Sequence, residues 1–258
     1  MKKTKITLLL SLLLSLLLIF CSCSIEKRSP LDFYPLPDGT YGVKAGKAMY
    51  LEKIIIPDTY RSKPVTTILP NGFGGSNGNT AVNLVEITIP KTITTIGENA
   101  FEGCSKINNI VIPDSVTSIG NSAFSNCSSL TNITIPNSVT YIGSCAFLYC
   151  SSLKSITIPD SIKTINDHTF MQCYNLTSII IPNSVNYIDR WAFESCYNLQ
   201  SVYYAGPAND WSEIHIYNDD YGNYDLVNST IYFYSETEPT EEGNFWHWGE
   251  NGEVVVWE

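Results

Sequence analysis

A unit of 23 residues recurs five times between Leu84 and Asn198, and this repetition constrains the fold more than any other feature of the sequence. The units share the pattern L-x-x-I-x-I-P-x-S-V-x-x-I-G-x-x-A-F-x-x-C-x-x. A fixed period of about 20 to 50 residues is typical of stacked repeat architectures. The marker positions are Pro90, Pro113, Pro136, Pro159 and Pro182, then Phe101, Phe124, Phe147, Phe170 and Phe193, and finally Cys104, Cys127, Cys150, Cys173 and Cys196.

Each unit contains two short runs rich in β-branched residues, such as 133–135 and 139–142, and these predict two short strands per coil. Pro136 separates the runs, because proline cannot donate to a sheet ladder. The apolar residues of segment 146–150 then follow at helical spacing, which predicts one helical or 3-10 turn that closes the coil.

One column of the repeat holds Gly97, Gly120 and Gly143. A sharp bend or a positive φ there would favour a residue without a Cβ atom. The last two units carry Asn166 and Asp189 in this column, and both residue types tolerate the left-handed region.

A single unit has about seven apolar positions and cannot bury them alone, so like residues of neighbouring coils must stack. We therefore expect Phe124 to contact Phe147, and Ile133 to lie on the same sheet as Ile156. Six coils at about 4.8 Å each give a stack only about 30 Å long. Such a stack has a wide solvent-facing surface and no deep pocket.

The strand motif L-x-x-I-x-I, followed by I-P-x-S-V-x-x-I-G-x-x-A-F-x-x-C, resembles the BspA-like, or Treponema-type, branch of the leucine-rich repeat superfamily. The resemblance covers roughly residues 34–235. It implies a leucine-rich repeat solenoid of mostly short parallel β-strands, capped at both ends by β-rich elements. It also implies export to a bacterial surface, contact with other molecules, and no catalytic residues to transfer.

Residues 1–22 have the features of a signal peptide, with three lysines before the uncharged run Ile6–Phe20. The run is too short to span a membrane comfortably. A bacterial lipoprotein site requires a small residue before the acylated cysteine, so Ser22 favours lipidation of Cys23, with Cys21 as the alternative. Ordinary secretory cleavage, which would release a soluble protein, remains open.

The remaining boundaries follow from breaks in the repeat. An Asp-Gly pair at 38–39 and an Asn-Gly pair at 251–252 predict hairpins near the two ends. Two five-residue insertions, after Pro57 and after Phe73, make the first repeat irregular. We therefore expect an N-terminal linker and cap at 23–49, an irregular first repeat at 50–83, five regular repeats at 84–198, a C-terminal cap at 199–235, and an acidic connector with a terminal hairpin at 236–258.

The charge is concentrated at one end of the chain. Residues 199–258 contain 12 acidic residues and no lysine or arginine, whereas the chain as a whole has a net charge of −10. Without a cluster of basic residues, nucleic acid is excluded as a partner, and a membrane would be contacted through the lipid anchor only.

The cysteine column suggests disulfides or a metal, but five parallel side chains that point into a core favour buried free thiols. Histidine occurs only at positions 168, 215 and 247, outside any nucleophile or metal motif. The oxygen-rich segment 218–225 lacks the ligand spacing of a calcium loop and is interpreted as an acidic surface turn. We therefore expect no enzyme activity, no cofactor and no metal.

The exposed columns hold hydroxyl, amide and tyrosine side chains, which suit a binding face. The predicted function is a surface adhesion module that binds an extracellular or host protein; a carbohydrate-binding protein and a structural spacer are the alternatives. The aromatic members could instead cover the last coils beneath the cap. The candidate face comprises Tyr141, Tyr187, Trp191, Tyr174, Tyr197, Thr117, Thr140 and Lys163.

Overall fold

The computed structural model describes residues 29–75, 80–217 and 222–257. The predicted signal peptide, Cys21 and Cys23 lie outside these ranges, as do parts of the second insertion and of segment 218–225. The chain divides into two units, residues 1–30 and 31–258, and the described strands and helices all belong to the second unit. None of the helices in the described ranges has the length and hydrophobicity that a membrane crossing requires.

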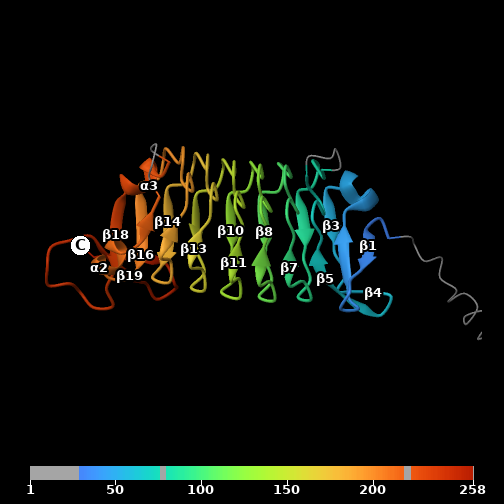
Figure 1. Ribbon diagram of the computed structural model, residues 1–258, viewed down its shortest axis with the longest axis horizontal. Helices are drawn as coiled ribbons and strands as arrows, with labels where there is room; N and C mark the ends of the chain where they lie inside the picture. The colour runs from blue at the N-terminus through green and yellow to red at the C-terminus, as the bar shows by residue number, and fades with distance from the viewer. Residues whose placement is uncertain (1–28, 76–79, 218–221, 258) are drawn as a thin grey trace, which may run out of the picture. The chain divides into compact units, whose positions relative to one another are not determined.

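Each repeat forms one coil, and the coils stack in chain order (Figure 1). The first strand of each coil continues along one side of the stack, which we call the first-strand line. Side chains in these short strands alternate between solvent and core. The line consists of β3 (Lys53–Ile55), β6 (Glu86–Thr88), β8 (Asn109–Val111), β10 (Asn132–Thr134), β12 (Ser155–Thr157), β14 (Ser178–Pro182), β16 (Ser201–Ala205) and β18 (Thr230–Tyr234).

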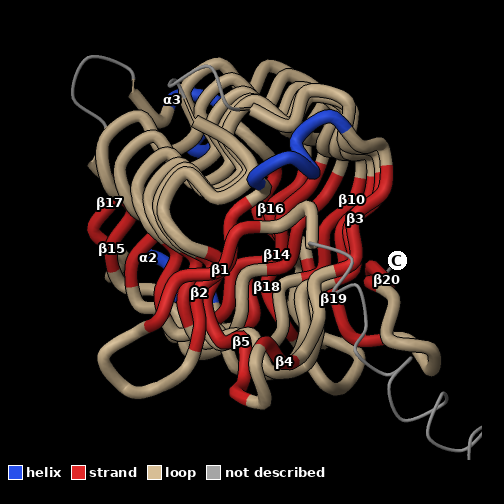
Figure 2. The backbone as a smooth tube through the Cα atoms, turned by 90° about the vertical axis from the view of Figure 1, so that its right-hand side faces the viewer, coloured by secondary structure: helices blue, strands red, loops and turns tan. Residues whose placement is uncertain are grey.

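The second strand of each coil forms a separate side of the stack, the second-strand line. Seen end on, the strands and the turn segments occupy different parts of the coil (Figure 2). Both predicted strands per coil are thus confirmed. The second line consists of β5 (Lys63–Ile68), β7 (Thr95–Ile96), β9 (Ser118–Ile119), β11 (Tyr141–Ile142), β13 (Thr164–Ile165), β15 (Tyr187–Ile188) and β17 (His215–Ile216).

The segment that closes each coil consists of turns in which local and inter-coil hydrogen bonds alternate. In one coil, Ser125 N donates to Ser122 O (3.1 Å), which is the 3-10 type of bond that the sequence predicts. The intervening Phe124 N donates to Ala146 O of the next coil (2.8 Å). Because every second N–H bonds to a neighbouring coil, residues 84–198 form isolated turns here and no continuous helix.

Like side chains stack through the core as expected. The rings of Phe124 and Phe147 lie 5.5 Å apart at an interplanar angle of 6°, and the phenylalanine ladder continues in both directions. The five cysteines of the repeat are buried free thiols, as predicted. The core is therefore a set of parallel columns, each made of one residue type.

The sequence suggested a sharp bend or a positive φ as the reason for glycine in this column, and the structure shows that positive φ is not the reason. A Cβ atom on Gly120 would lie 2.6 Å from Glu98 N and 2.7 Å from Gly97 C, so glycine is needed because the preceding coil passes close by. Positive φ values occur instead in two other columns, which hold residues such as Asn99, Tyr149 and Trp191.

The N-terminal end is covered by a hairpin of β1 (Asp32–Pro35) and β2 (Tyr41–Lys44), as predicted. A 3-10 helix, η1 (Gly46–Tyr50), follows. The first insertion forms β4 (Thr59–Tyr60), which pairs antiparallel with β5. The stack therefore begins with a paired strand instead of an open core.

The stack continues beyond Leu199, where the sequence pattern breaks. Helices α2 (Ala208–Ser212) and α3 (Tyr224–Val227) connect β16, β17 and β18, which pair in parallel with the preceding coil or with each other. The expected cap residues Ile214 and Leu226 are buried in the core, and Trp211, Ile216, Ile231 and Phe233 pack against it. The terminal hairpin, β19 (Phe245–Trp248) with β20 (Val254–Val256), adds to β18.

Both strand lines are interrupted at one joint between coils, and the first-strand line is interrupted a second time between β6 and β8. Strands β11 and β13 belong to different sheets, and so do β10 and β12. The expectation that Ile133 and Ile156 share a sheet is therefore wrong, although both side chains remain buried in the common core. We call this joint the fault.

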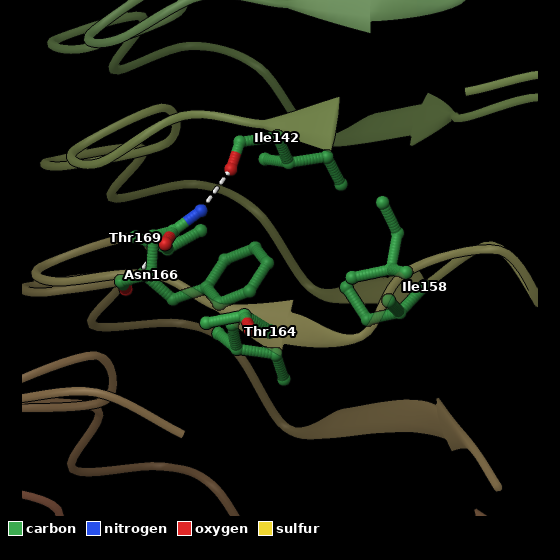
Figure 3. A pocket seen from close by; sticks show the side chains of 8 residues that line it. Ile142, Ile158, Thr164, Asn166 and Thr169 are labelled. Carbon is green, nitrogen blue, oxygen red and sulfur yellow. Dashed lines mark hydrogen bonds between the residues drawn. The ribbon is translucent and has the colours of Figure 1, made fainter. Parts of the chain in front are cut away.

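Asn166 explains the fault. In the coils on either side, the residue in the glycine column donates its backbone N–H to the preceding coil, as Gly143 does to Ile119 O (2.9 Å). At the fault, the Ile142 carbonyl accepts a hydrogen bond from the side-chain Nδ2 of Asn166 in place of one from the backbone (2.6 Å; Figure 3). The side chain of Asn166 thus takes the carbonyl that a backbone N–H would otherwise use, and a small cavity of about 10 Å³ lies at this joint, lined by side chains that include Ile158.

Candidate binding surface

From β8 to β16, the outward side chains of the first-strand line form a strip without charged residues, whose members are exposed or partly exposed. They project from β8, β10, β12, β14 and β16, and neighbouring strands present them in two parallel rows. We call this set the uncharged strip. Its members are Asn109, Val111, Asn132, Thr134, Ser155, Thr157, Ser178, Ile180 and Ser201.

The N-terminal end of the strip is hollowed and partly apolar. Between β6 and β8 lies an open hollow of about 500 Å³, lined by residues that include Glu86, Thr88 and Val111. Val111 is 71% exposed. Beyond the hollow, Lys53 pairs with Glu86 (2.7 Å), but both side chains are exposed, so the pair contributes little to stability.

The C-terminal end of the strip is closed by a cluster of five aromatic side chains. Tyr203 stacks on Tyr232 with ring centroids 5.1 Å apart. The edge of Trp246 contacts Tyr203 (5.8 Å) and Tyr234 (5.3 Å), and Trp248 packs against Trp246 (4.9 Å). We call these residues the aromatic cluster.

Trp246 fixes the terminal hairpin to the outer side of the sheet. Its side chain is fully buried, and its Nε1–H donates to Tyr204 O (2.9 Å). Burial of an indole with its N–H satisfied contributes strongly to packing. The terminal hairpin is therefore packed against the sheet. Trp248, on the same hairpin, remains 43% exposed beside the strip.

The buried thiols have a role that the pattern did not reveal. Each Sγ–H donates to a phenylalanine carbonyl of the preceding coil, as Cys150 does to Phe124 O (3.2 Å) and Cys173 to Phe147 O (3.2 Å). Burial raises the pKa of Cys104 and Cys173 to about 12, and raises the pKa of Cys150 well above its usual value. The thiols therefore stay protonated and act as structural donors.

A second group of polar side chains lies on the turn side of the stack. Asp167 accepts a bond from His168 Nδ1 (2.7 Å), and the His168 ring lies 5.0 Å from that of Trp191. Cys145 has a raised pKa, chiefly through burial, so its thiol is a poor nucleophile. In the described ranges, His, Cys, Asp and Glu do not gather in groups of three that could hold a metal ion.

The residues predicted as a binding face are divided between the second-strand line and the turns. Thr117, Thr140, Tyr141, Lys163 and Tyr187 lie on or just before the second-strand line. Tyr141 is exposed, whereas Tyr187 stacks on His215 of the cap (5.1 Å). Most of this group is thus a surface separate from the uncharged strip.

The remaining three members lie on the turns. Trp191 is half-buried between His168 and Gly222, whose Cβ, if present, would lie 2.6 Å from the indole. Tyr174 and Tyr197 stack on one another with centroids 5.9 Å apart and remain exposed. Trp191 and Tyr187 therefore pack against the cap, as the alternative interpretation expected, and the eight residues do not form one cluster.

The aromatic cluster itself was not predicted from the sequence. The signal was present, because β16 alternates outward and inward residues, which places Tyr203 outside and Tyr204 inside. The location of Trp246 had no such signal, since it depends on how the hairpin folds back onto the sheet.

Comparisons with known proteins agree with this architecture. A family model described as a BspA type leucine rich repeat region matches residues 75–200 in six copies. None of the curated proteins matches the chain by sequence.

Several solved structures are similar to the chain. A leucine rich cell surface protein from Faecalibacterium prausnitzii A2-165 is 29% identical with a TM-score of 0.65, and the match covers 89% of this chain and 59% of that one. The T. pallidum leucine rich repeat protein is 24% identical with a TM-score of 0.56, over 67% of this chain and 89% of that one. A leucine-rich repeat protein from Eubacterium ventriosum is 24% identical with a TM-score of 0.54, and the match covers 87% of this chain and 54% of that one.

The chain thus spans little more than half the length of the F. prausnitzii and E. ventriosum proteins. The similarities to the T. pallidum and E. ventriosum proteins, both at 24% identity, show a shared fold only. Since the 23-residue units, the stacked coils and the matched repeat model all agree, residues 75–200 of this chain form a leucine-rich repeat region of the BspA type.

Proposed function

We propose that this chain is a non-catalytic binding module displayed at a bacterial surface, which captures a protein partner through the uncharged strip. The observation that carries the proposal is the strip itself, an exposed and regular face that ends in the aromatic cluster. Hydroxyl and amide side chains can form hydrogen bonds with varied partners, and aromatic residues are frequent energetic anchors of interfaces. The likeness to a surface protein of F. prausnitzii supports display at the surface.

Some hydroxyl groups beside the strip are already oriented by the protein. Thr131 Oγ1 donates to Asn108 O (3.1 Å) and Thr177 Oγ1 donates to Lys154 O (3.1 Å), each to the preceding coil. Their protons are used internally, so these oxygens present acceptor lone pairs to a partner. A partner that supplies N–H or O–H donors would fit this edge.

The test compares two arginine substitutions on different faces. Thr157→Arg places a large charge in the middle of the strip, whereas Thr140→Arg places the same charge on the second-strand line; both threonines are exposed. Extracellular proteins retained by the wild-type protein should be lost with T157R and retained with T140R. Loss with T140R alone would assign binding to the face predicted from sequence.

Carbohydrate capture is the second candidate, because Tyr197 has an open ring backed by Tyr174. The amides of Asn175 and Asn198 lie nearby in sequence and donate to Ser151 O and Tyr174 O, which leaves their oxygens as acceptors. Binding on a glycan array that disappears in Tyr197→Ala but persists in T157R would favour this function.

Attachment through Cys23 is part of the proposal for localisation. The lipoprotein processing site predicted from Ser22 and Cys23 would retain the module at the cell envelope. Mass spectrometry of the mature N-terminus should find a diacylglyceryl-modified Cys23, and an unmodified N-terminus would indicate a released protein.

A further inference from the structure

We propose that the aromatic cluster and the hairpin beside it dock an arginine- or lysine-rich segment of the protein partner. This inference rests on the proposed function and specifies the chemistry of one end of the binding surface. Three features support it: the exposed ring of Trp248, the two carboxylates on the hairpin turn that follows it, and the charge of the surrounding segment.

The aromatic cluster lies outside the hydrophobic core. Its side chains contact one another on the outer side of β16 and β18, and none of them belongs to the core cluster of the stack. Four of the five remain at least partly exposed, and Trp248 is the most open. Indole is the best aromatic acceptor for a cation, because its ring carries a large negative quadrupole.

Two carboxylates accompany this ring on the same hairpin. The Glu253 carboxylate lies over Gly249, where a Cβ atom would be 2.5 Å away, and its Oε2 accepts the N–H of Asn251 (3.0 Å). Glu250 is exposed at the turn. Gly249 directly follows Trp248, and neighbouring residues of a strand point to opposite faces, so Glu253 adds negative charge to the hairpin from the face opposite the indole.

The surrounding segment supplies no cation of its own. Residues 199–258 contain no lysine or arginine, and the Lys–carboxylate pair found in the described ranges, Lys53 with Glu86, is located at the other end of the stack. A positively charged partner would therefore be attracted by a field that the chain itself leaves unneutralised.

The chain already contains the interaction that the docking requires. Arg190 lies over the ring of Tyr217 with its guanidinium carbon 4.5 Å from the centroid, and Arg61 lies over Tyr60 at 5.4 Å. Both pairs use an arginine on the surface of a coil. The aromatic cluster presents the same acceptor chemistry without an arginine from its own segment.

The test uses three eight-residue peptides that alternate glycine with arginine, glutamine or glutamate. Calorimetry at low salt should show binding of the arginine peptide alone, which weakens as salt is added because the charges are screened. Trp248→Ala should weaken binding roughly threefold or more, and Trp248→Phe should restore part of it. Glu250→Gln should weaken binding by about twofold.

The matched control is Tyr50→Ala, which removes an exposed aromatic residue from the N-terminal end. It should leave the affinity for the arginine peptide unchanged. Equal affinity of the arginine and glutamine peptides would overturn the inference, as would identical effects of W248A and Y50A. The assay uses neither the captured partner nor T157R, so its failure can be separated from failure of the proposed function.

Discussion

At the scale of single residues, the cysteine column shows how one side chain can satisfy packing and hydrogen bonding together. Cysteine fills a small space in the core, and its proton reaches a carbonyl of the preceding coil that the turn leaves available. The sequence predicted the burial, because the column is apolar and regular. It could not predict the bond, since the partner carbonyl is set by the register between coils.

Ionisation of the thiols should limit stability at alkaline pH. The folded pKa of Cys173 is about 12, whereas the unfolded thiol ionises near its usual value of 9.0. Stability from this group is therefore complete below pH 9 and is lost as the pH rises toward 12, at about 1.4 kcal/mol per pH unit. The free energy of unfolding, measured by urea titration at several pH values between 9 and 11, should therefore fall less steeply with pH in Cys173→Ala than in the wild type, by about 1.4 kcal/mol per pH unit.

Cys145→Ala is the control for that experiment, because Cys145 is only half-buried and lies off the column. Its substitution should change the pH dependence of the free energy of unfolding much less. Identical pH slopes for wild type and C173A would contradict a protonated structural thiol.

The left-handed column before each cysteine also affects stability. Tyr149 has a φ of +59°, a conformation that Asn126 adopts in the equivalent position of the previous coil. Because asparagine tolerates this region better than tyrosine, Tyr149→Asn should stabilise the fold by about 0.5 to 1 kcal/mol, measured by urea unfolding. Tyr174→Asn, outside the left-handed columns, should bring no such gain.

At the scale of strands and turns, regularity depends on the glycine column. Where the backbone N–H of this column bonds to the preceding coil, as at Gly143 and Asp189, neighbouring strands of the second-strand line stay paired; where the Asn166 side chain takes that carbonyl, β11 and β13 separate. Periodicity alone predicted both strands in every coil, but it could not predict this interruption. The difference is that asparagine has a side-chain N–H to donate to the preceding coil, whereas the carboxylate of Asp189 does not.

Restoring glycine should close the fault. In Asn166→Gly, the backbone N–H can donate to Ile142 O, so amide hydrogen exchange at residues 163–166 should become slower than in the wild type. Asp189→Gly is the matched control, because Asp189 N already donates to Ile165 O (2.9 Å). Slow exchange at 163–166 in the wild type itself would show that the joint does not open.

The cap depends on one buried amide. Asn223 is fully buried; its Oδ1 accepts Phe193 N–H (3.0 Å) and its Nδ2 donates to Asp189 O (2.9 Å). Asn223→Ala should cost about 2 to 3 kcal/mol, because it leaves a buried N–H and a carbonyl without these partners. Asn228→Ala, which removes an exposed amide that donates to Tyr224 O, should stay within about 0.5 kcal/mol of wild type in urea unfolding.

At the scale of the whole stack, the architecture was predictable, and the location of the binding surface was not. Repetition indicated which columns are buried, since a 23-residue period leaves the same side chains facing the core in every coil. The candidate face predicted from exposed columns combined residues of the second-strand line with residues of the turns. The aromatic cluster depends on the return of residues 245–257 to the sheet, a long-range contact that no periodic pattern encodes.

The hydrogen bonds of the thiols all point in one direction, from each coil to the one before it, so consecutive joints are chemically alike. A duplicated unit would therefore meet neighbours that it already fits, and the length of the chain could change by whole units without redesign. Inserting a second copy of residues 107–129 after position 129 should raise the melting temperature, because it adds one more interface of the ordinary kind. A second copy of residues 153–175, which carries Asn166, should raise it less, and equal gains from the two insertions would show that the joints are energetically indistinguishable.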